Sequence, residues 1–224
     1  MNLLNLITDP YDRQARLYPA ILLIAPVALS AVAILTERLT GLHTIGALLI
    51  GLGGAFLLTQ LARDAGKRGE KTLFEKWGGI PSVAIFRHSD SRLDSSTKAR
   101  YHKKVAALVK EAKAPTEEQE RADPVAADEV YSAWSNYLRV NTRDTNKFAL
   151  LFKENVNYGY RRNVWGLRPL GIAASALSLA ACVGWIYFWH RSPQALDASV
   201  IGAAAFNALL LLLWLFRFTD DWVR

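Results

Sequence analysis

The stretch Tyr18–Leu35 has the sequence YPAILLIAPVALSAVAIL and contains no charged residue. An α-helix rises about 1.5 Å per residue, so a helix of this length nearly covers the roughly 30 Å hydrocarbon core of a bilayer. Three further windows have the same apolar character, namely 44–62, 169–189 and 198–216. The sequence therefore predicts an all-α membrane protein with four transmembrane helices.

The apolar windows lie towards the two ends of the chain, and the middle is polar. No basic leader or cleavage motif accompanies the first window, so we expect that helix to be retained. This distribution predicts two transmembrane hairpins with a helical cytosolic insert between the second and third spans. The expected segments are an N-terminal cytosolic or interfacial segment 1–17, hairpin 18–62, a basic domain 63–168, hairpin 169–216 and a cytosolic tail 217–224.

The basic residues indicate the orientation in the membrane. Segment 63–168 holds 21 of the 27 Lys and Arg residues but 14 of the 20 acidic ones, so it accounts for the whole formal charge of +7. The loops 36–43 and 190–197 carry one Arg each. Because Lys and Arg concentrate in cytoplasmic segments near the membrane, we expect both termini and the central domain to be cytoplasmic.

Within the basic domain, the helix of the second span is expected to continue past Arg63 and to stop at Trp77-Gly78-Gly79-Ile80-Pro81, since glycine and proline interrupt helices. A short extended piece at 82–86 and a mobile loop at 89–97 should follow. A basic amphipathic helix is then predicted over 98–113, with Val105, Leu108 and Val109 facing inward and cations, Lys98 among them, on the other faces.

Two more helices are predicted before the third span. Asp123-Pro124 provides an N-cap and a first-turn proline for a helix that should end near 141–144, with Val130, Trp134, Tyr137 and Leu138 on its apolar stripe. A last helix is expected over about 145–155. Their aromatic surface is enough for a small core.

Sequence motifs for catalysis and cofactor binding are absent. The four histidines, His43, His88, His102 and His190, lie in separate segments without Cys or acidic partners at metal-ligand spacing. There is no phosphate loop, dinucleotide fingerprint or nucleophile elbow, and the predicted span interiors contain no carboxylate. We therefore expect no metal site, no cofactor and no enzymatic activity.

Two basic clusters are candidate ligand sites. In the first, cations alternate with an aromatic ring that could stack a base, although a solvated helix face or contact with anionic lipid explains it equally well. In the second, arginines are followed by Asn and Tyr side chains, which could bind a nucleotide. The same residues could also form an elbow, that is, a turn at the membrane surface whose aromatic side chains lie at the level of the headgroups. The candidate residues are Arg100, Tyr101, Lys103 and Lys104 in the first cluster, and Arg139, Arg143, Lys147, Asn157, Tyr158, Arg161 and Arg162 in the second.

Small residues recur every four positions in the predicted spans, which allows helix backbones to approach closely. The contacts could lie within one chain or between chains of a homo-oligomer, in which some positions could line a pore. The positions singled out are Gly51, Ala55, Ser178, Ala203 and Asn207, and Cys182 is expected to be a small packing residue rather than a reactive thiol.

Three pieces of the chain resemble small bacterial membrane proteins, which implies a bacterial inner-membrane location. They are Tyr11-Asp12-Arg13-Gln14-Ala15-Arg16-Leu17-Tyr18-Pro19, Leu61-Ala62-Arg63-Asp64-Ala65-Gly66-Lys67 and Tyr158-Gly159-Tyr160-Arg161-Arg162-Asn163. The layout as a whole is similar to four-span effectors of bacterial anti-phage defence, including membrane effectors of CBASS-type systems and the channel-forming effector of the Hailong system.

The resemblance implies a homo-oligomeric effector that senses a nucleotide or short oligonucleotide made by a partner nucleotidyltransferase, and whose spans then open a pore in the lipid bilayer. The main alternative is a non-conducting membrane scaffold or accessory subunit that docks a cytosolic partner. A membrane enzyme acting on lipid is a weaker alternative, because the catalytic constellations are missing.

Overall fold

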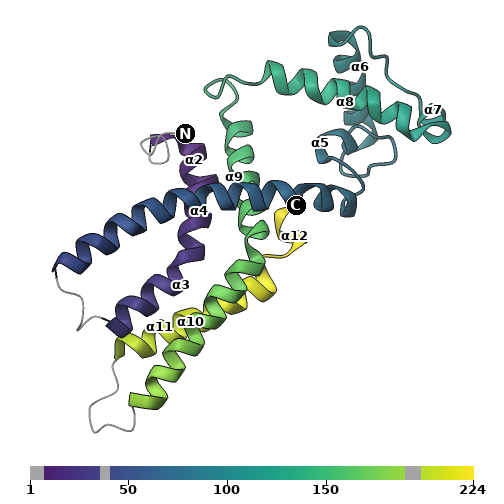
Figure 1. Ribbon diagram of the computed structural model, residues 1–224. Coiled ribbons are helices and arrows are strands. Elements are labelled where there is room, and N and C mark those ends of the chain that lie inside the picture. Colours follow the sequence, from purple (N-terminus) through teal and green to yellow (C-terminus); the bar gives the residue numbers. More distant parts are fainter. Residues whose placement is uncertain (1–7, 36–40, 190–197) are drawn as a thin grey trace. The chain divides into compact units, whose positions relative to one another are not determined.

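The computed structural model describes residues 8–35, 41–189 and 198–224, without the side chains of 41–53, 55 and 189. In these ranges every regular element is helical, which confirms the all-α class (Figure 1). The chain divides into two compact units. The membrane unit comprises Met1–Glu70 and Lys153–Arg224, and the insert domain comprises Lys71–Phe152.

The membrane unit contains three described helices long and apolar enough to cross a bilayer: Pro10–Leu35, Arg168–Phe188 and Ala198–Arg217. The first combines α2 (Pro10–Asp12), the π-helical turn η1 (Arg13–Leu17) and α3 (Tyr18–Leu35). The second corresponds to α10 (Arg168–Trp189). The third combines α11 (Ala198–Leu212) with the π-helical turn η3 (Leu213–Arg217), and α12 (Asp220–Val223) follows it.

Helices α3, α10 and α11 all pack against one another. Their outward faces carry large apolar side chains, such as Val32, Leu177 and Phe216, that remain more than half exposed. A soluble protein would bury most of such a surface, whereas lipid solvates it without cost. The three predicted spans 18–35, 169–189 and 198–216 thus correspond to helices of the right length and surface.

The second predicted span, 44–62, lies within α4 (Gly41–Lys76). The side chains of 41–53 and 55 lie outside the described residues, and with them the predicted packing positions Gly51 and Ala55. The loops 36–40 and 190–197 also lie outside the described residues, and the second of these loops includes His190. A fourth span and the hairpin arrangement therefore stay predictions.

Helix α4 runs on from the predicted span to Lys76, as expected, and stops at two glycines. Gly78 and Gly79 have φ values of 76° and 131°, which side-chain-bearing residues rarely adopt. The N–H of Gly79 donates to the carbonyl of Phe74 at 2.7 Å and closes the helix end. The extended piece predicted at 82–86 was wrong, because Pro81 occupies the first turn of a short helix, α5 (Pro81–Ala84).

The insert domain is completed by α6 (Ser95–Leu108), α7 (Glu117–Ala122) and α8 (Pro124–Asn141). Asp94 caps α6 by accepting the N–H of Thr97, so the helix begins before the predicted residue 98 and shortens the expected loop 89–97. It also ends at Leu108 instead of 113. Asp123 caps α8 by accepting the N–H of Ala126, as predicted.

An aromatic cluster forms the core of the insert domain. The rings of Phe86, Tyr131 and Trp134 pack together with Val83 and Val105 around them, and Tyr131 and Trp134 are fully buried. Trp134 was predicted to face this core, but Tyr131 was missed.

Two positions predicted for α6 were wrong. Leu108 is 48% exposed, because the helix ends there, and Lys98 is 6% exposed although a cation was expected to face solvent. Lys98 can lie inside because backbone carbonyls accept its ammonium hydrogens.

The last helix before the third span, α9, covers Ala149–Gly166. The predicted helix 145–155 was therefore placed too early and ended too soon. The segment considered as an elbow, 155–163, is regular helix, and the chain turns only at Gly166 and Leu167 before α10 begins. Gly159 and Tyr160 do not interrupt it, since a single glycine costs a helix only about 1 kcal/mol.

Candidate functional site: the α9 anchor

Helix α9 contacts the start of the first span through the backbone carbonyl of Ala15. Pro19 has no N–H, so the carbonyl of Ala15 lacks its usual donor four residues later. The side-chain Nδ2 of Asn163 donates to this oxygen at 2.7 Å, and both Ala15 and Asn163 are buried. This contact therefore ties α9 to the turn before α3, at a carbonyl to which the residue four positions later cannot donate.

A charged contact holds α9 to α4. The guanidinium NH1 of Arg162 lies 2.9 Å from Oε1 of Glu70, and the hydroxyl of Tyr158 donates to the same oxygen at 2.9 Å. Arg162 is buried, so the pair is shielded from water. Burial, together with the nearby carboxylate, raises the pKa of Tyr158 above its usual range, so this tyrosine is neutral at physiological pH.

Close backbone packing accompanies this ion pair. A Cβ built on Gly166 would lie 2.4 Å from the backbone nitrogen of Gly66, and one built on Gly66 would lie 2.2 Å from Oδ1 of Asn163. Such distances leave no room for any side chain. The crossing of α4 and α9 in the membrane unit therefore requires glycine on both helices.

Side chains at the end of α9 and the start of α10 hold the C-terminal segment. Trp165 Nε1 donates to Oδ1 of Asp220 at 2.7 Å. Arg168 donates from Nε to the carbonyl of Trp214 at 2.9 Å and from NH2 to that of Leu215 at 2.8 Å. A guanidinium at the end of a helix satisfies free carbonyls and complements the helix dipole.

These contacts, made by Tyr158, Arg162, Asn163, Trp165 and Gly166 and called here the α9 anchor, tie one helix to the first span, to α4 and to α12, which follows the last span. Two predicted ligand residues, Tyr158 and Arg162, belong to the anchor. Of the others on α9, Arg161 is exposed with NH1 3.5 Å from the carbonyl of Trp222, and Asn157 is half-buried.

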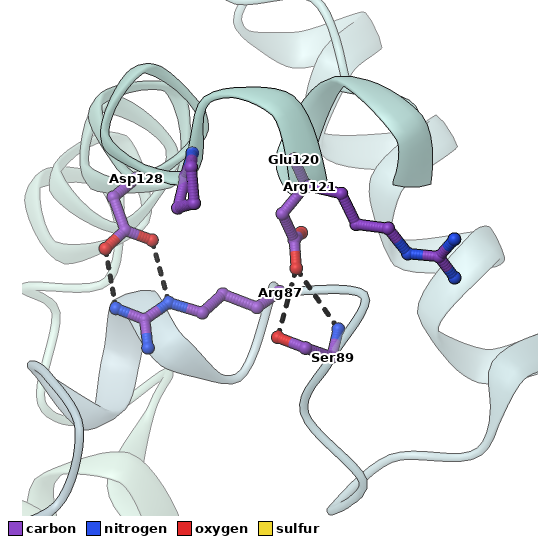
Figure 2. Close-up of a pocket in the computed structure, with 6 residues that line it drawn as sticks. Arg87, Ser89, Glu120, Arg121 and Asp128 are labelled. Carbon is purple, nitrogen blue, oxygen red and sulfur yellow. Dashed lines mark hydrogen bonds and ion pairs between the residues drawn. The ribbon is translucent and has the colours of Figure 1, made fainter.

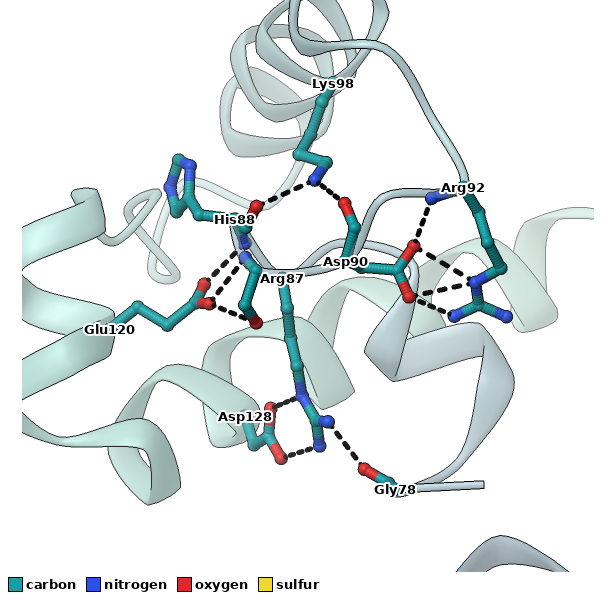
Figure 3. A network of polar contacts seen from close by, with 9 residues as sticks. Gly78, Arg87, His88, Asp90, Arg92, Lys98, Glu120 and Asp128 are labelled. Carbon is teal, nitrogen blue, oxygen red and sulfur yellow. Dashed lines mark hydrogen bonds and ion pairs between the residues drawn. The ribbon is translucent and has the colours of Figure 1, made fainter. Parts of the chain in front are cut away.

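The insert domain contains a buried carboxylate, Glu120, with four donors. Its oxygens accept the backbone N–H of His88 at 2.7 Å (Figure 3). They also accept the N–H and the hydroxyl of Ser89, each at 3.1 Å, and the hydroxyl of Tyr131 at 2.8 Å. Burial alone would favour the protonated acid, but these hydrogen bonds outweigh it and hold the pKa of Glu120 below its ordinary value. Burial and the same contact raise the pKa of Tyr131.

Two histidines that are remote in the sequence meet beside this carboxylate. The ring centroids of His88 and His102 are 4.8 Å apart. His88 Nε2 lies 3.0 Å from the carbonyl of Pro115, and His102 Nε2 lies 2.6 Å from that of Phe86. Burial lowers the pKa of His102. Within the described ranges, no group of His, Cys, Asp and Glu side chains could hold a metal ion.

A cleft of about 380 Å³ lies on the surface of the insert domain, lined by Arg87, Ser89, Glu120, Arg121, Pro124 and Asp128 (Figure 2). Arg87 forms a two-pronged pair with Asp128, at 2.8 Å from Nε and 2.6 Å from NH2, and also donates to the carbonyl of Gly78 at 2.6 Å. The charged groups of the cleft are thus largely paired with one another. The sequence analysis did not propose any of the residues that line the cleft as part of a ligand site.

The predicted ligand residues of the insert domain lie in two places. Arg100, Tyr101, Lys103 and Lys104 are exposed on α6, whereas Arg139 is exposed at the end of α8, and Arg143 and Lys147 lie in the turn after it. His102 and Val105 of α6 pack on Tyr131 and Trp134, which lie before the end of α8. The two basic clusters do not converge on one pocket.

A polar cluster connects the three described spans. Asn207 Nδ2 donates to Oγ of Ser30 at 2.8 Å, and the thiol of Cys182 lies 3.3 Å from the same hydroxyl. Oδ1 of Asn207 is buried with no hydrogen-bond partner in the described part of the chain. The predicted packing positions Ser178 and Ala203 are also buried, so three of the five lie between helices of one chain.

Comparison with known proteins gave no relative: no family model, curated protein or solved structure matches this chain.

Proposed function

We propose that this chain is an oligomeric four-span membrane effector whose pore is controlled by a phosphorylated ligand, a nucleotide or short oligonucleotide. Three apolar helices of sufficient length support the membrane placement, and α4 covers the fourth window. The concentration of Lys and Arg in 63–168 supports a cytoplasmic insert domain and cytoplasmic termini in a bacterial inner membrane. A nucleotidyltransferase would be the partner that supplies the ligand.

The observation that carries this proposal is the continuity of α9. Residues 149–152 of this helix belong to the insert domain, and residues from 153 onward belong to the membrane unit. A helix transmits displacement along its axis, because each turn is hydrogen-bonded to the next. The α9 anchor contacts the first span, α4 and α12, and Arg168 at the start of α10 contacts the end of the last span, so a movement of α9 would act on all of them.

The turn between α8 and α9 is the place where a ligand would act most directly. Asp144 orders it by accepting the N–H groups of Asn146 and Lys147 at 3.0 Å each. Arg139, Arg143 and Lys147 are exposed there and supply charge-assisted donors for phosphate. A phosphate held by these cations would add charge-assisted contacts immediately before the first residue of α9.

The test is ion flux from vesicles that contain the purified full-length chain, measured while a panel of cyclic and linear nucleotides is added. We expect one nucleotide class to change the flux. Arg143→Ala should weaken its apparent affinity about ten- to a hundredfold, because one charge-assisted contact contributes roughly 1.5–3 kcal/mol. The equally exposed cation Lys113, replaced by Ala, is the matched control and should behave as wild type.

A second pair of variants tests the coupling through α9. Gly166→Ala forces α4 and α9 apart, whereas Gly184→Ala in α10 places its methyl group where no other atom lies within 4 Å. We expect Gly166→Ala to change ligand-dependent flux while nucleotide binding is retained, and Gly184→Ala to change neither. Flux that no nucleotide alters in the wild-type chain would contradict the gated pore.

The alternative, a non-conducting scaffold, is favoured by the cleft beside Arg87 and Arg121, which offers a cytosolic protein a concave surface with both signs of charge. A chain that binds a cytosolic protein through this cleft and conducts no ions under any condition would establish the scaffold instead.

A further inference from the structure

The exposed side of α6 combines cations with apolar side chains in a way that the ligand site proposed above does not use. At 100° per residue, Lys103, Ala107, Arg100, Lys104, Leu108 and Tyr101 follow one another around roughly 160° of the helix. All six are exposed, and this set is called here the α6 face. Lys98, His102 and Val105 occupy the opposite, buried side.

The cations of the α6 face are unpaired within the part of the chain that the structure describes. Arg100 lies over the ring of Tyr101 at 5.7 Å, and no carboxylate pairs with Arg100, Lys103 or Lys104. By contrast, Arg87 forms a two-pronged pair with Asp128. The charge of the α6 face is thus available to an external partner.

The insert domain also separates its charges. Residues 99–113 carry five cations and one carboxylate, whereas residues 114–130 carry one cation and six carboxylates. The acidic part includes the exposed residues Glu117, Glu118, Asp123 and Glu129. A negatively charged surface would therefore attract one part of the domain and repel the other, which fixes its orientation.

We propose that α6 docks on the bilayer, with the α6 face against anionic phospholipid headgroups. The charges are complementary to such a surface, and each Lys or Arg near it shifts the balance towards the bound form about fivefold. Tyr101 and Leu108 supply the apolar border that a helix at the membrane interface inserts among the headgroups. Because the spans already hold the chain at a membrane, even a modest attraction between the α6 face and the headgroups is enough to keep α6 docked.

A lipid surface explains this face better than a soluble nucleotide does. The α6 face is the convex side of a helix, and the described cleft of the insert domain is lined by other residues. The cations of the α6 face point away from one another around the helix, so they offer a single phosphate fewer simultaneous contacts than they offer a surface of many headgroups. An extended anionic surface, however, requires only that the cations share one side of the domain.

The test uses the full-length chain in lipid nanodiscs. Cys182→Ala removes the single native cysteine, and Ala107→Cys or Ala122→Cys introduces one label site, on the α6 face or at the end of α7. Both alanines are exposed, so the two substitutions are matched. A fluorophore on each cysteine is quenched by spin-labelled lipid in discs of phosphatidylcholine alone or mixed with phosphatidylglycerol, without any nucleotide present.

We expect quenching at position 107 in anionic discs only, and none at position 122 in either lipid. Replacing both Lys103 and Lys104 by Gln should shift the docked fraction about 25-fold towards the undocked state, and added salt should act in the same direction. Equal quenching at both positions, equal quenching in neutral and anionic lipid, or no effect of the double substitution would overturn the proposal. Since neither ligand nor flux is measured, this outcome is separate from that of the gated pore.

Discussion

Glu120 in the insert domain and Asn207 in the membrane unit are both buried polar side chains, but they differ in how far their hydrogen-bonding capacity is used. Both oxygens of Glu120 accept two hydrogen bonds each. Asn207 uses its nitrogen, while its oxygen has no partner in the described residues. The fully hydrogen-bonded carboxylate of Glu120 therefore favours a single arrangement of the insert domain. The unpaired amide oxygen of Asn207, by contrast, destabilises the packing of the spans.

The largest effect should follow from removing the carboxylate of the insert domain. Glu120→Ala leaves the N–H groups of His88 and Ser89 and the hydroxyl of Tyr131 without an acceptor. We expect the free energy of unfolding of this domain to fall by about 3 kcal/mol or more. Hydrogen exchange of the amides of α8, measured on the full-length chain in detergent, would report this loss.

The control for this substitution is Glu118→Ala, two residues earlier and exposed, which should change the same exchange rates little. If Glu120→Ala left the exchange of α8 as slow as in the wild type, the carboxylate would not hold the domain together, and the contrast with Asn207 would disappear.

Acidification should weaken the insert domain in two stages. The pKa of His102 is lowered from 6.5 by burial among His88, Lys98, Glu120 and Tyr131, so the unfolded chain binds more protons and stability falls as the pH drops below about 6.5. The pKa of Glu120 is lowered from 4.5, so a further loss begins near that pH. Hydrogen exchange of α8 between pH 7 and pH 4 would follow both stages.

His102→Phe separates the two stages. Phenylalanine keeps a ring in the aromatic core but does not titrate, so the loss of stability between pH 7 and pH 5 should become shallower while the stage below pH 4.5 stays. An unchanged pH profile would assign the upper stage to another group.

The smallest effect is expected in the spans. Asn207→Leu removes a hydrogen bond to Ser30 worth about 0.6 kcal/mol, but it also removes the unpaired buried oxygen. We expect the free energy of unfolding in detergent, measured by thermal denaturation, to rise slightly, by about 1 kcal/mol or less. A loss of several kcal/mol would mean that the amide oxygen has a partner after all, and that the two buried groups are alike.

The sequence predicted the elements that depend on local signals. Apolar length located α3, α10 and α11, and the Gly78-Gly79 pair and the Asp123-Pro124 cap located the end of α4 and the start of α8. These signals act over a few residues, so no tertiary information was needed. The α9 helix was misjudged because Asn and Gly residues suggested a bend, whereas packing on α4 and on the first span stabilises the helix.

The candidate site was predicted less well, because its contacts join residues far apart in the chain. Arg162 pairs with Glu70 across 92 positions, and Glu120 meets Ser89 across 31. In the sequence Arg162 is one of many cations, and nothing near it identifies a partner. Only the fold shows that the carboxylate of Glu70 already pairs with it. Lys98 likewise has the sequence environment of a surface residue, and it is buried because carbonyls of the loop before α6 accept its hydrogens.

The carbonyl of Ala15, which can receive no hydrogen bond from Pro19, has a consequence for biosynthesis. It accepts a hydrogen bond from Asn163, 148 positions later. A chain growing from the ribosome therefore inserts its first span before the residue that donates to this oxygen has been synthesised. The span attains its native hydrogen bonding only after the whole insert domain has been synthesised. Truncated translation products that stop before residue 163 should consequently lack this contact between α9 and the first span, whatever the condition of the insert domain they already contain.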